Sequence, residues 1–169
     1  FVLNKKKKLI YNDVRKFGFI KIYNSSLITQ SQHLKHLGPE PLEKNWNFSY
    51  LKNYLIGRKR SIKNILMDQK CVSGLGNIYV NEILFLSGIK PVRQATNLKN
   101  FEIKKIIKSS KKILKNSIKL GGSTIKDFSS ENGKKGDFQQ HFKVYGREDQ
   151  DCSNICLLYT SPSPRDSNL

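Results

Sequence analysis

The sequence predicts a mainly α-helical domain preceded by a few short β-strands. Between residues 61 and 88, two short stretches of helical apolar spacing lie on either side of the glycine-rich sequence S-G-L-G. Residues 100–120 form a longer stretch of the same kind. In contrast, residues 18–23 alternate well enough between apolar and polar side chains to predict a strand.

The predicted strands come first in the chain. Residues 1–4 and 9–11 flank a run of lysines, which predicts a hairpin with a basic tip, and residues 18–23 add a third strand. A polar segment follows and contains L-G-P-E-P-L at residues 37–42. Two prolines in three residues disfavour a helix, so this segment is expected to be a linker.

Two helices are predicted outside the glycine-rich region. Asn47 or Ser49 can cap a helix that runs through Leu55 and ends at Gly57. The longest helix spans residues 100–120, with a solvated face of seven lysines between residues 104 and 119. Its apolar stripe is expected to be core and consists of Ile103, Ile106, Ile107, Ile113, Leu114 and Ile118. Residues 142–147 predict a strand followed by a turn.

The glycine-rich reversal is the candidate binding element. Gly74 and Gly76 break the helical pattern, and Asn77 is a good N-cap for the helix that follows and that Gly88 ends. A helix that starts after such a turn presents backbone N–H groups and a positive dipole end, which suit a phosphate. The alternative is an ordinary tight helix–turn–helix in an all-α core.

Charge favours the binding interpretation. The chain has 31 basic and 13 acidic residues, a net charge of +18 on 169 residues, which indicates a polyanionic partner. An anionic membrane surface is the competing partner, but the sequence has no apolar run of about 18 residues that could span a bilayer. The basic residues are also spread over several elements, so nucleic acid is the favoured partner.

The three cysteines do not form a disulfide framework, and they favour a reducing cytoplasm. Cys71 lies in the central motif and is expected to be a small buried apolar residue. The chain shows no signal peptide, and Phe1 is not a start methionine. We therefore expect that the chain begins inside a larger protein.

Three motifs together resemble the formamidopyrimidine-DNA glycosylase family of bacterial base-excision repair enzymes. They are D-V-R-K-F-G at 13–18, V-S-G-L-G-N-I-Y-V-N-E-I-L-F at 72–85, and G-G-S-T-I-K-D-F, G-K-K-G-D-F-Q-Q and V-Y-G-R-E between 121 and 148. The second motif resembles the family's helix–two-turn–helix. The resemblance implies the end of a β-sandwich catalytic domain at 1–25, a linker at 26–44, a DNA-binding domain with a lesion-capping loop at 45–150, and the start of a zinc hairpin at 151–169.

The resemblance also implies roles for six residues in binding damaged double-stranded DNA. Arg15 and Phe17 match the residues that fill the gap left by an extruded base. Lys63 matches a lysine near the damaged nucleotide, and Lys126 is the candidate for contact with the lesion. The remaining two residues, Asn77 and Tyr145, are candidates for contacts with backbone phosphates. Each also has a plain structural interpretation, such as a surface lysine or a half-buried strand tyrosine.

The end of the chain departs from the family pattern. The family's zinc hairpin has two Cys-x2-Cys pairs, whereas this chain has Cys152 in the first position, Cys156 at a wider spacing, and no later cysteine. The resemblance implies one zinc ion, but this chain does not complete a four-ligand site. Residues 157–169 resemble nothing in the family and are expected to be a non-native tail. Lys135, Gly136 and Asp137 stand where the family commonly has Pro-Gly-Tyr, which leaves the preferred lesion open.

The activity that the resemblance implies is that of a bifunctional, monomeric enzyme. The family removes 8-oxoguanine and formamidopyrimidines and then cleaves the backbone at the abasic site, using an N-terminal proline amine and a neighbouring glutamate. This chain does not contain those residues, so no catalytic residue is named and the chain itself is expected to be inactive.

Three alternatives stay open. They are an endonuclease VIII-type glycosylase for oxidised pyrimidines, a non-enzymatic DNA- or RNA-binding module, and a ribosomal-type helix–two-turn–helix protein.

Overall fold

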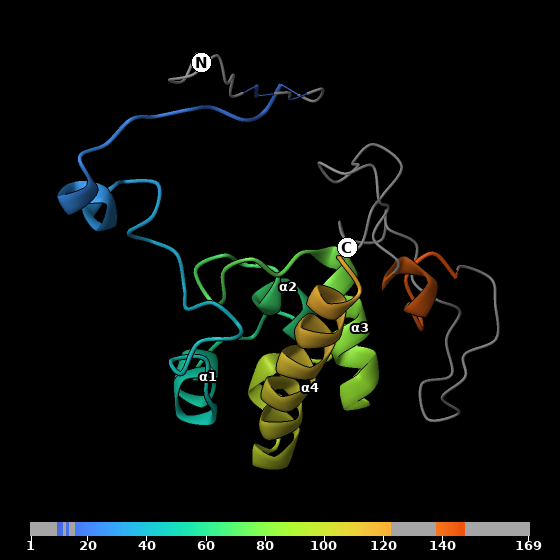
Figure 1. Ribbon diagram of the computed structural model, residues 1–169. Helices are drawn as coiled ribbons and strands as arrows, with labels where there is room; N and C mark the ends of the chain where they lie inside the picture. The colour runs from blue at the N-terminus through green and yellow to red at the C-terminus, as the bar shows by residue number, and fades with distance from the viewer. Residues whose placement is uncertain (1–9, 12, 14–15, 123–137, 148–169) are drawn as a thin grey trace. The chain divides into compact units, whose positions relative to one another are not determined.

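The computed structural model describes residues 10, 11, 13, 16–122 and 138–147. The chain divides into two units, residues 1–35 and 36–169, each of which is described by itself. The second unit contains the four α-helices labelled in Figure 1, with short 3-10 helices between and after them. The α-helices are α1 (Phe48–Leu55), α2 (Ile62–Leu66), α3 (Asn77–Ser87) and α4 (Asn100–Lys119), and the 3-10 helices are η3 (Ala95–Asn97) and η4 (Phe138–His141).

The first unit contains the 3-10 helix η2 (Ser25–Gln30) and an extended segment before it. The strand predicted at residues 18–23 is not formed, because a strand exists only as part of a ladder and no described residue pairs with this segment. One local turn is well defined here. The Asp13 carboxylate accepts hydrogen bonds from the backbone N–H of Lys16 at 3.1 Å and of Gly18 at 2.6 Å.

The predicted helices of the second unit are confirmed, and local capping explains where three of them start or end. The Asn47 side chain accepts a hydrogen bond from the Tyr50 amide at the start of α1, and the Ser61 hydroxyl does the same for Asn64 at the start of α2. Gly88 ends α3 with a left-handed φ of 69°.

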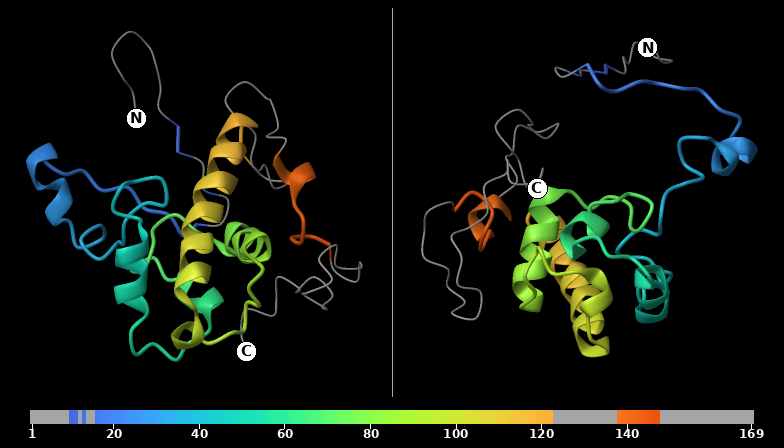
Figure 2. Two further views of the ribbon diagram at one scale, coloured as in Figure 1. Left: turned by 90° about the horizontal axis from the view of Figure 1, so that it is seen from below. Right: turned by 180° about the vertical axis from the view of Figure 1, so that it is seen from behind.

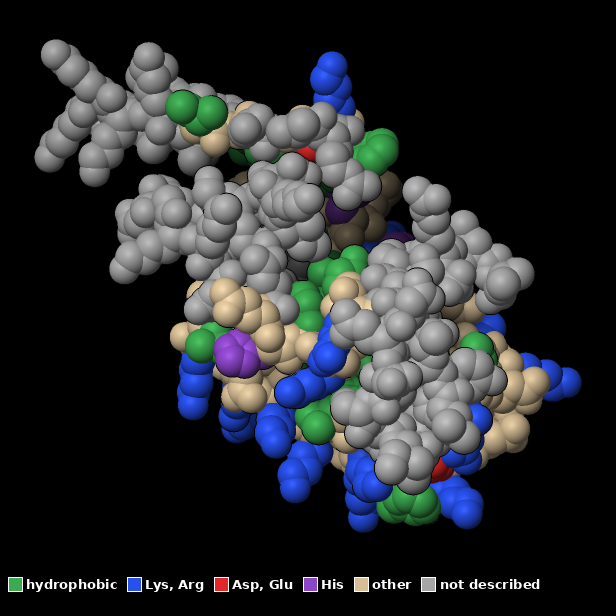
Figure 3. Space-filling model, turned by 90° about the vertical axis from the view of Figure 1, so that its right-hand side faces the viewer, with side chains coloured by type: hydrophobic (Ala, Val, Ile, Leu, Met, Phe, Trp, Pro, Cys, Tyr) green, Lys and Arg blue, Asp and Glu red, His purple; other side chains and the backbone are tan. Residues whose placement is uncertain are grey.

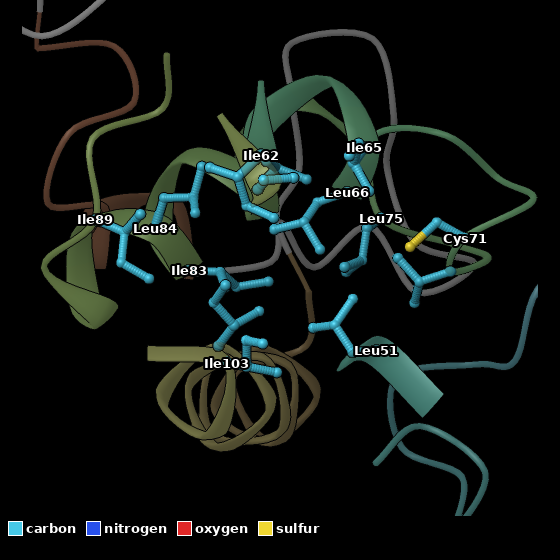
Figure 4. Close-up of a cluster of buried hydrophobic side chains, with 14 of the residues drawn as sticks. Leu51, Ile62, Ile65, Leu66, Cys71, Leu75, Ile83, Leu84, Ile89 and Ile103 are labelled. Atoms are coloured by element: carbon cyan, nitrogen blue, oxygen red, sulfur yellow. The ribbon is translucent and has the colours of Figure 1, made fainter. Parts of the chain in front are cut away.

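The core lies between the helices. α3 and α2 pack together, and α4 packs against both α3 and α1 (Figure 2). Their buried side chains converge in Figure 4, where Leu51 of α1, Ile62 and Leu66 of α2, Ile83 of α3 and Ile103 of α4 point toward one another. Each of these side chains is at most 4% exposed, so hydrophobic burial holds the helices as one body.

Serines on α4 make polar contacts within this packing. The indole Nε1 of Trp46 donates to Ser110 Oγ at 2.8 Å, the Ser87 hydroxyl donates to Ser109 Oγ at 3.1 Å, and the Tyr79 hydroxyl lies 2.7 Å from Ser117 Oγ. Small side chains let the helices approach closely, and each buried hydroxyl in these pairs has a partner.

One position of the predicted α4 stripe is wrong. Ile103, Ile106 and Ile113 are buried, but Ile118 is 65% exposed. The inward position in the last turn belongs to Ser117, because the buried positions 106, 110, 113 and 117 repeat at intervals of three and four residues.

The strand predicted at residues 142–147 is also not formed. These residues follow η4 as a turn that ends at Gly146, which has a φ of 72°. Their amides bond to a side chain of α3 instead of a neighbouring strand, as described below.

The segment at residues 38–39 is fastened to the loop after α2. The Gly38 amide donates to the Gln69 carbonyl at 2.8 Å, and the Ser73 amide donates to the Pro39 carbonyl at 3.1 Å. A Cβ at Gly38 would lie only 2.5 Å from the carbonyl oxygen of Cys71. Glycine is therefore required here by the close approach of two backbones.

We predict that Gly38→Ala destabilises the domain by about 1–3 kcal/mol, because one backbone segment must move to relieve the clash. Chemical denaturation monitored by circular dichroism measures this loss. Gly76→Ala is the matched control, since a Cβ at Gly76 would meet no atom within 4 Å. Equal stability of the two variants would contradict the packing described for residue 38.

Cys71 is a buried core residue, as the sequence predicted. Burial, and secondly the charge of Asp68, raises the pKa of its thiol to about 12. The reactive thiolate is therefore scarce in the folded protein near pH 8.

We predict that iodoacetamide at about pH 8 alkylates Cys71 slowly in the folded chain and rapidly once urea unfolds it. Peptide mass mapping separates this residue from Cys152 and Cys156. Equal alkylation rates for Cys71 in the two conditions would contradict its burial.

Candidate nucleic-acid interface

The turn between α2 and α3 has one buried side chain and two exposed glycines. Leu75 is 1% exposed and enters the core, whereas Gly74 and Gly76 on either side of it lie at the surface. The Gln69 side chain fixes the turn, because its Oε1 accepts from the Gly74 amide at 2.8 Å and its Nε2 donates to the Leu75 carbonyl at 3.0 Å. The backbone thus forms a fixed and accessible bend.

The two glycines differ in backbone conformation, and only one of them needs to be glycine for that reason. Gly74 has a φ of 79°, which L side chains rarely adopt. Gly76 has an extended backbone, with φ −108° and ψ −179°, and space for a Cβ. Nothing within the described fold requires glycine at position 76. Because Gly76 has no side chain, a ligand can approach its backbone closely.

The first residue of α3 is Asn77, and Gly76 is the N-cap. The prediction that Asn77 caps the helix is therefore wrong, and no side chain within the described residues caps the start of α3. An uncapped helix start presents its first amides and a partial positive charge to the outside. This arrangement suits a phosphate oxygen.

The Asn77 side chain is held by Asn81, one turn further along α3. Asn81 Nδ2 donates to Asn77 Oδ1 at 3.2 Å. Asn81 is 4% exposed, and its own Oδ1 has no partner in the described part of the chain. Because the Asn77 oxygen is engaged, its amide nitrogen is the group that can donate to an anion.

Tyr145 makes one contact with α3 and one within its own segment. Its backbone amide donates to Glu82 Oε1 at 3.0 Å, and its ring meets the Phe142 ring edge-on with centroids 5.8 Å apart. Glu82 was not among the candidate residues. The only sequence feature that could have drawn attention to it is an acidic residue in an otherwise uncharged helix, N-I-Y-V-N-E-I-L-F-L-S.

Positive charge gathers on the face of the molecule drawn in Figure 3. Figure 3 shows Lys and Arg side chains projecting from one face, with few acidic side chains between them. The lysines of α4 form the solvated face that the sequence predicted, since six of the seven are exposed and Lys111 is half-buried. Such a field attracts a polyanion over a range of about 10 Å.

The structure describes only some of the predicted site residues. Phe17 belongs to the first unit, where its side chain is 80% exposed. Lys63 lies on α2, and it is 7% exposed. The other candidates, Arg15, Lys126, Cys152 and Cys156, lie outside the described residues.

The described residues contain neither a metal-binding cluster nor a membrane-spanning helix. Within residues 10, 11, 13, 16–122 and 138–147, no group of three or more His, Cys, Asp or Glu side chains could hold a metal ion. The helices of the same residues include none with the length and hydropathy that a bilayer crossing demands.

Comparison with known proteins identifies the helical unit. Residues 37–129 match the sequence profile of the formamidopyrimidine-DNA glycosylase H2TH domain. The chain is 42% identical to the formamidopyrimidine-DNA glycosylase of Rickettsia felis, a match that covers 91% of this chain and 55% of the relative. It is 44% identical to that of Psychromonas ingrahamii over 85% of this chain and 53% of the relative. The chain thus spans a little over half the length of these relatives.

Solved structures agree with this match. The complex between Lactococcus lactis Fpg and DNA that contains an abasic site superposes with a TM-score of 0.77 at 34% identity, covering 85% of this chain and 52% of that one. MutM in complex with DNA that contains carbocyclic 8-oxo-G gives a TM-score of 0.75 at 35% identity over the same shares. Since the profile covers more than half of the 169 residues, the chain belongs to the formamidopyrimidine-DNA glycosylase family.

Proposed function

We propose that the whole protein is a base-excision DNA glycosylase and abasic-site lyase that removes oxidised purines, and that this chain supplies its DNA-binding half. The observation that carries this proposal is the open turn at Gly74 and Gly76 before the uncapped start of α3. A family member is expected to place a backbone phosphate there. The solved relatives bound to abasic-site DNA and to 8-oxo-G DNA support a damaged duplex as the partner.

Within this proposal, phosphate contacts come from two places on the helical unit. The Asn77 amide nitrogen and the first amides of α3 bind one strand, and the Tyr145 hydroxyl holds a phosphate of the backbone. Such contacts fix the position of the protein on the duplex but read no sequence. Lesion recognition is assigned to Arg15 and Phe17, which fill the gap in the duplex, and to Lys126 with Lys63 at the extruded nucleotide.

The alternatives fit the observations less well. An endonuclease VIII-type enzyme and a non-enzymatic module would both keep a basic helix–two-turn–helix. The relatives compared above are, however, formamidopyrimidine-DNA glycosylases over most of this chain. We further propose that the protein acts as a monomer in the bacterial cytoplasm, with one duplex bound per chain.

Zinc does not fit the residues of this chain as a complete site. A structural zinc ion takes four ligands, and Cys71 is held in the hydrophobic core, away from any such role. Cys152 and Cys156 supply two thiols at most. We propose that the chain alone does not close the family's zinc site.

We predict that the chain binds a duplex with 8-oxoguanine more tightly than the same duplex without it, and that both affinities fall steeply with salt. The log–log slope should be about −0.9 per phosphate neutralised, because binding releases condensed cations. Fluorescence anisotropy between about 50 and 200 mM salt measures both. A flat salt response would contradict the electrostatic interface, and equal affinity for the two duplexes would favour the non-enzymatic alternative.

We predict that Gly76→Ala weakens binding to lesion and plain duplexes alike by about tenfold while the fold keeps its stability to within about 1 kcal/mol. The added Cβ has space in the free protein but lies where the phosphate must approach. Asn77→Ala should also lower the affinity for the lesion duplex and the plain duplex equally, since the lost donor contacts the DNA backbone. An unchanged DNA affinity of Gly76→Ala would contradict the proposal that the turn binds a phosphate.

A further inference from the structure

The Glu82 carboxylate is the meeting point of three successive backbone amides. Glu82 lies on α3 and is 5% exposed. Its Oε1 accepts from the N–H groups of Lys143 at 3.0 Å, Val144 at 2.9 Å and Tyr145 at 3.0 Å, and its Oε2 accepts from Lys143 at 2.9 Å. Sixty-one residues or more separate these partners in sequence.

This arrangement determines the local chain path. Three consecutive N–H groups can point at one carboxylate only if the backbone curls around it, as it does in an anion-binding nest. A buried carboxylate is costly unless it is hydrogen-bonded, so the segment and Glu82 stabilise each other. Gly146, at a φ of 72°, then leads the chain out of the turn.

Aromatic contacts attach the same segment to α3 a second time. Phe138 stacks on Tyr79 of α3 with ring centroids 6.2 Å apart, and Phe142 meets Phe138 edge-on at 5.5 Å. Phe142 in turn meets Tyr145 at 5.8 Å. These contacts place the rings beside α3, while Glu82 sets the direction of the backbone at residue 145.

We propose that Glu82 is a positioning residue that holds Tyr145 in a fixed geometry relative to the start of α3. This inference rests on the proposed function, in which Tyr145 and the turn before α3 each bind a phosphate. The same rigid helix positions Tyr145 and Asn77, because Glu82, which holds Tyr145, and Asn77 are five residues apart on α3. The two phosphate contacts thus keep a constant separation without any contact between Tyr145 and Asn77.

Glu82→Gln is the direct test. Glutamine has nearly the same size, but it is neutral and puts an amide NH₂ where one carboxylate oxygen accepts from Lys143. We expect hydrogen exchange at the amides of residues 143–145 to rise by about tenfold or more, while exchange in the middle of α4 stays unchanged. Unchanged exchange at residues 143–145 would overturn the inference. If Glu82→Gln does not fold, Glu82→Asp, which keeps the charge but shortens the reach, is measured in the same way.

A double-mutant cycle on DNA affinity separates positioning from general stability. Tyr145→Phe removes the hydroxyl, and we expect it and Glu82→Gln each to weaken duplex binding by about tenfold, with the double variant no weaker than either single variant by more than about twofold. Glu102→Gln is the matched control. Glu102 is also a buried carboxylate, but it pairs with Arg93 and the Lys99 amide, so its effect should be independent of residue 145.

These outcomes distinguish a failure of the positioning role of Glu82 from a failure of the proposed DNA-binding function. Additive effects of Glu82→Gln and Tyr145→Phe would overturn the positioning role, as would a loss in Tyr145→Phe with none in Glu82→Gln. If the wild-type chain binds no duplex, the proposed function fails and the positioning role fails with it.

Discussion

The burial of Leu75 between two exposed glycines is the constraint on which the helical unit depends. Its side chain enters the core formed by α2 and α3, and this fixes where the chain must reverse. Gln69 then holds the backbone of the turn from one side. The buried Leu75 side chain stabilises the turn, while the backbone on either side of it stays at the surface. Helix α3 begins there, and no described side chain caps it.

α3 connects this turn to the rest of the interface. Its buried face, with Val80, Ile83 and Leu84, packs in the core. Its polar positions serve other purposes, because Asn81 orients Asn77, Tyr79 reaches Ser117, and Glu82 gathers the amides of residues 143–145. One helix therefore defines the position of Asn77 and Tyr145, the two groups that we propose bind phosphates and that are far apart in sequence. Electrostatic attraction from the surrounding lysines is general, whereas these contacts determine geometry.

Much of this fold could be predicted from the sequence because its determinants are local. Asn47, Ser61 and Gly88 start or end helices through contacts within four residues. Two of the failures involve partners that lie far away in the sequence. The position of Ile118 depends on how α4 lies against Tyr79, and residues 142–147 follow the carboxylate of Glu82 in place of a strand partner. The six candidate site residues came from motif resemblance, and of these the structure describes Phe17, Lys63, Asn77 and Tyr145.

A crystal structure of the chain bound to a lesion duplex would test the central claim most directly. The account predicts a phosphate oxygen within about 3 Å of a backbone amide in the first turn of α3, with the Asn77 side chain donating to the same strand. A complex in which the duplex lies elsewhere and the Gly74–Gly76 turn contacts only protein or solvent would contradict it.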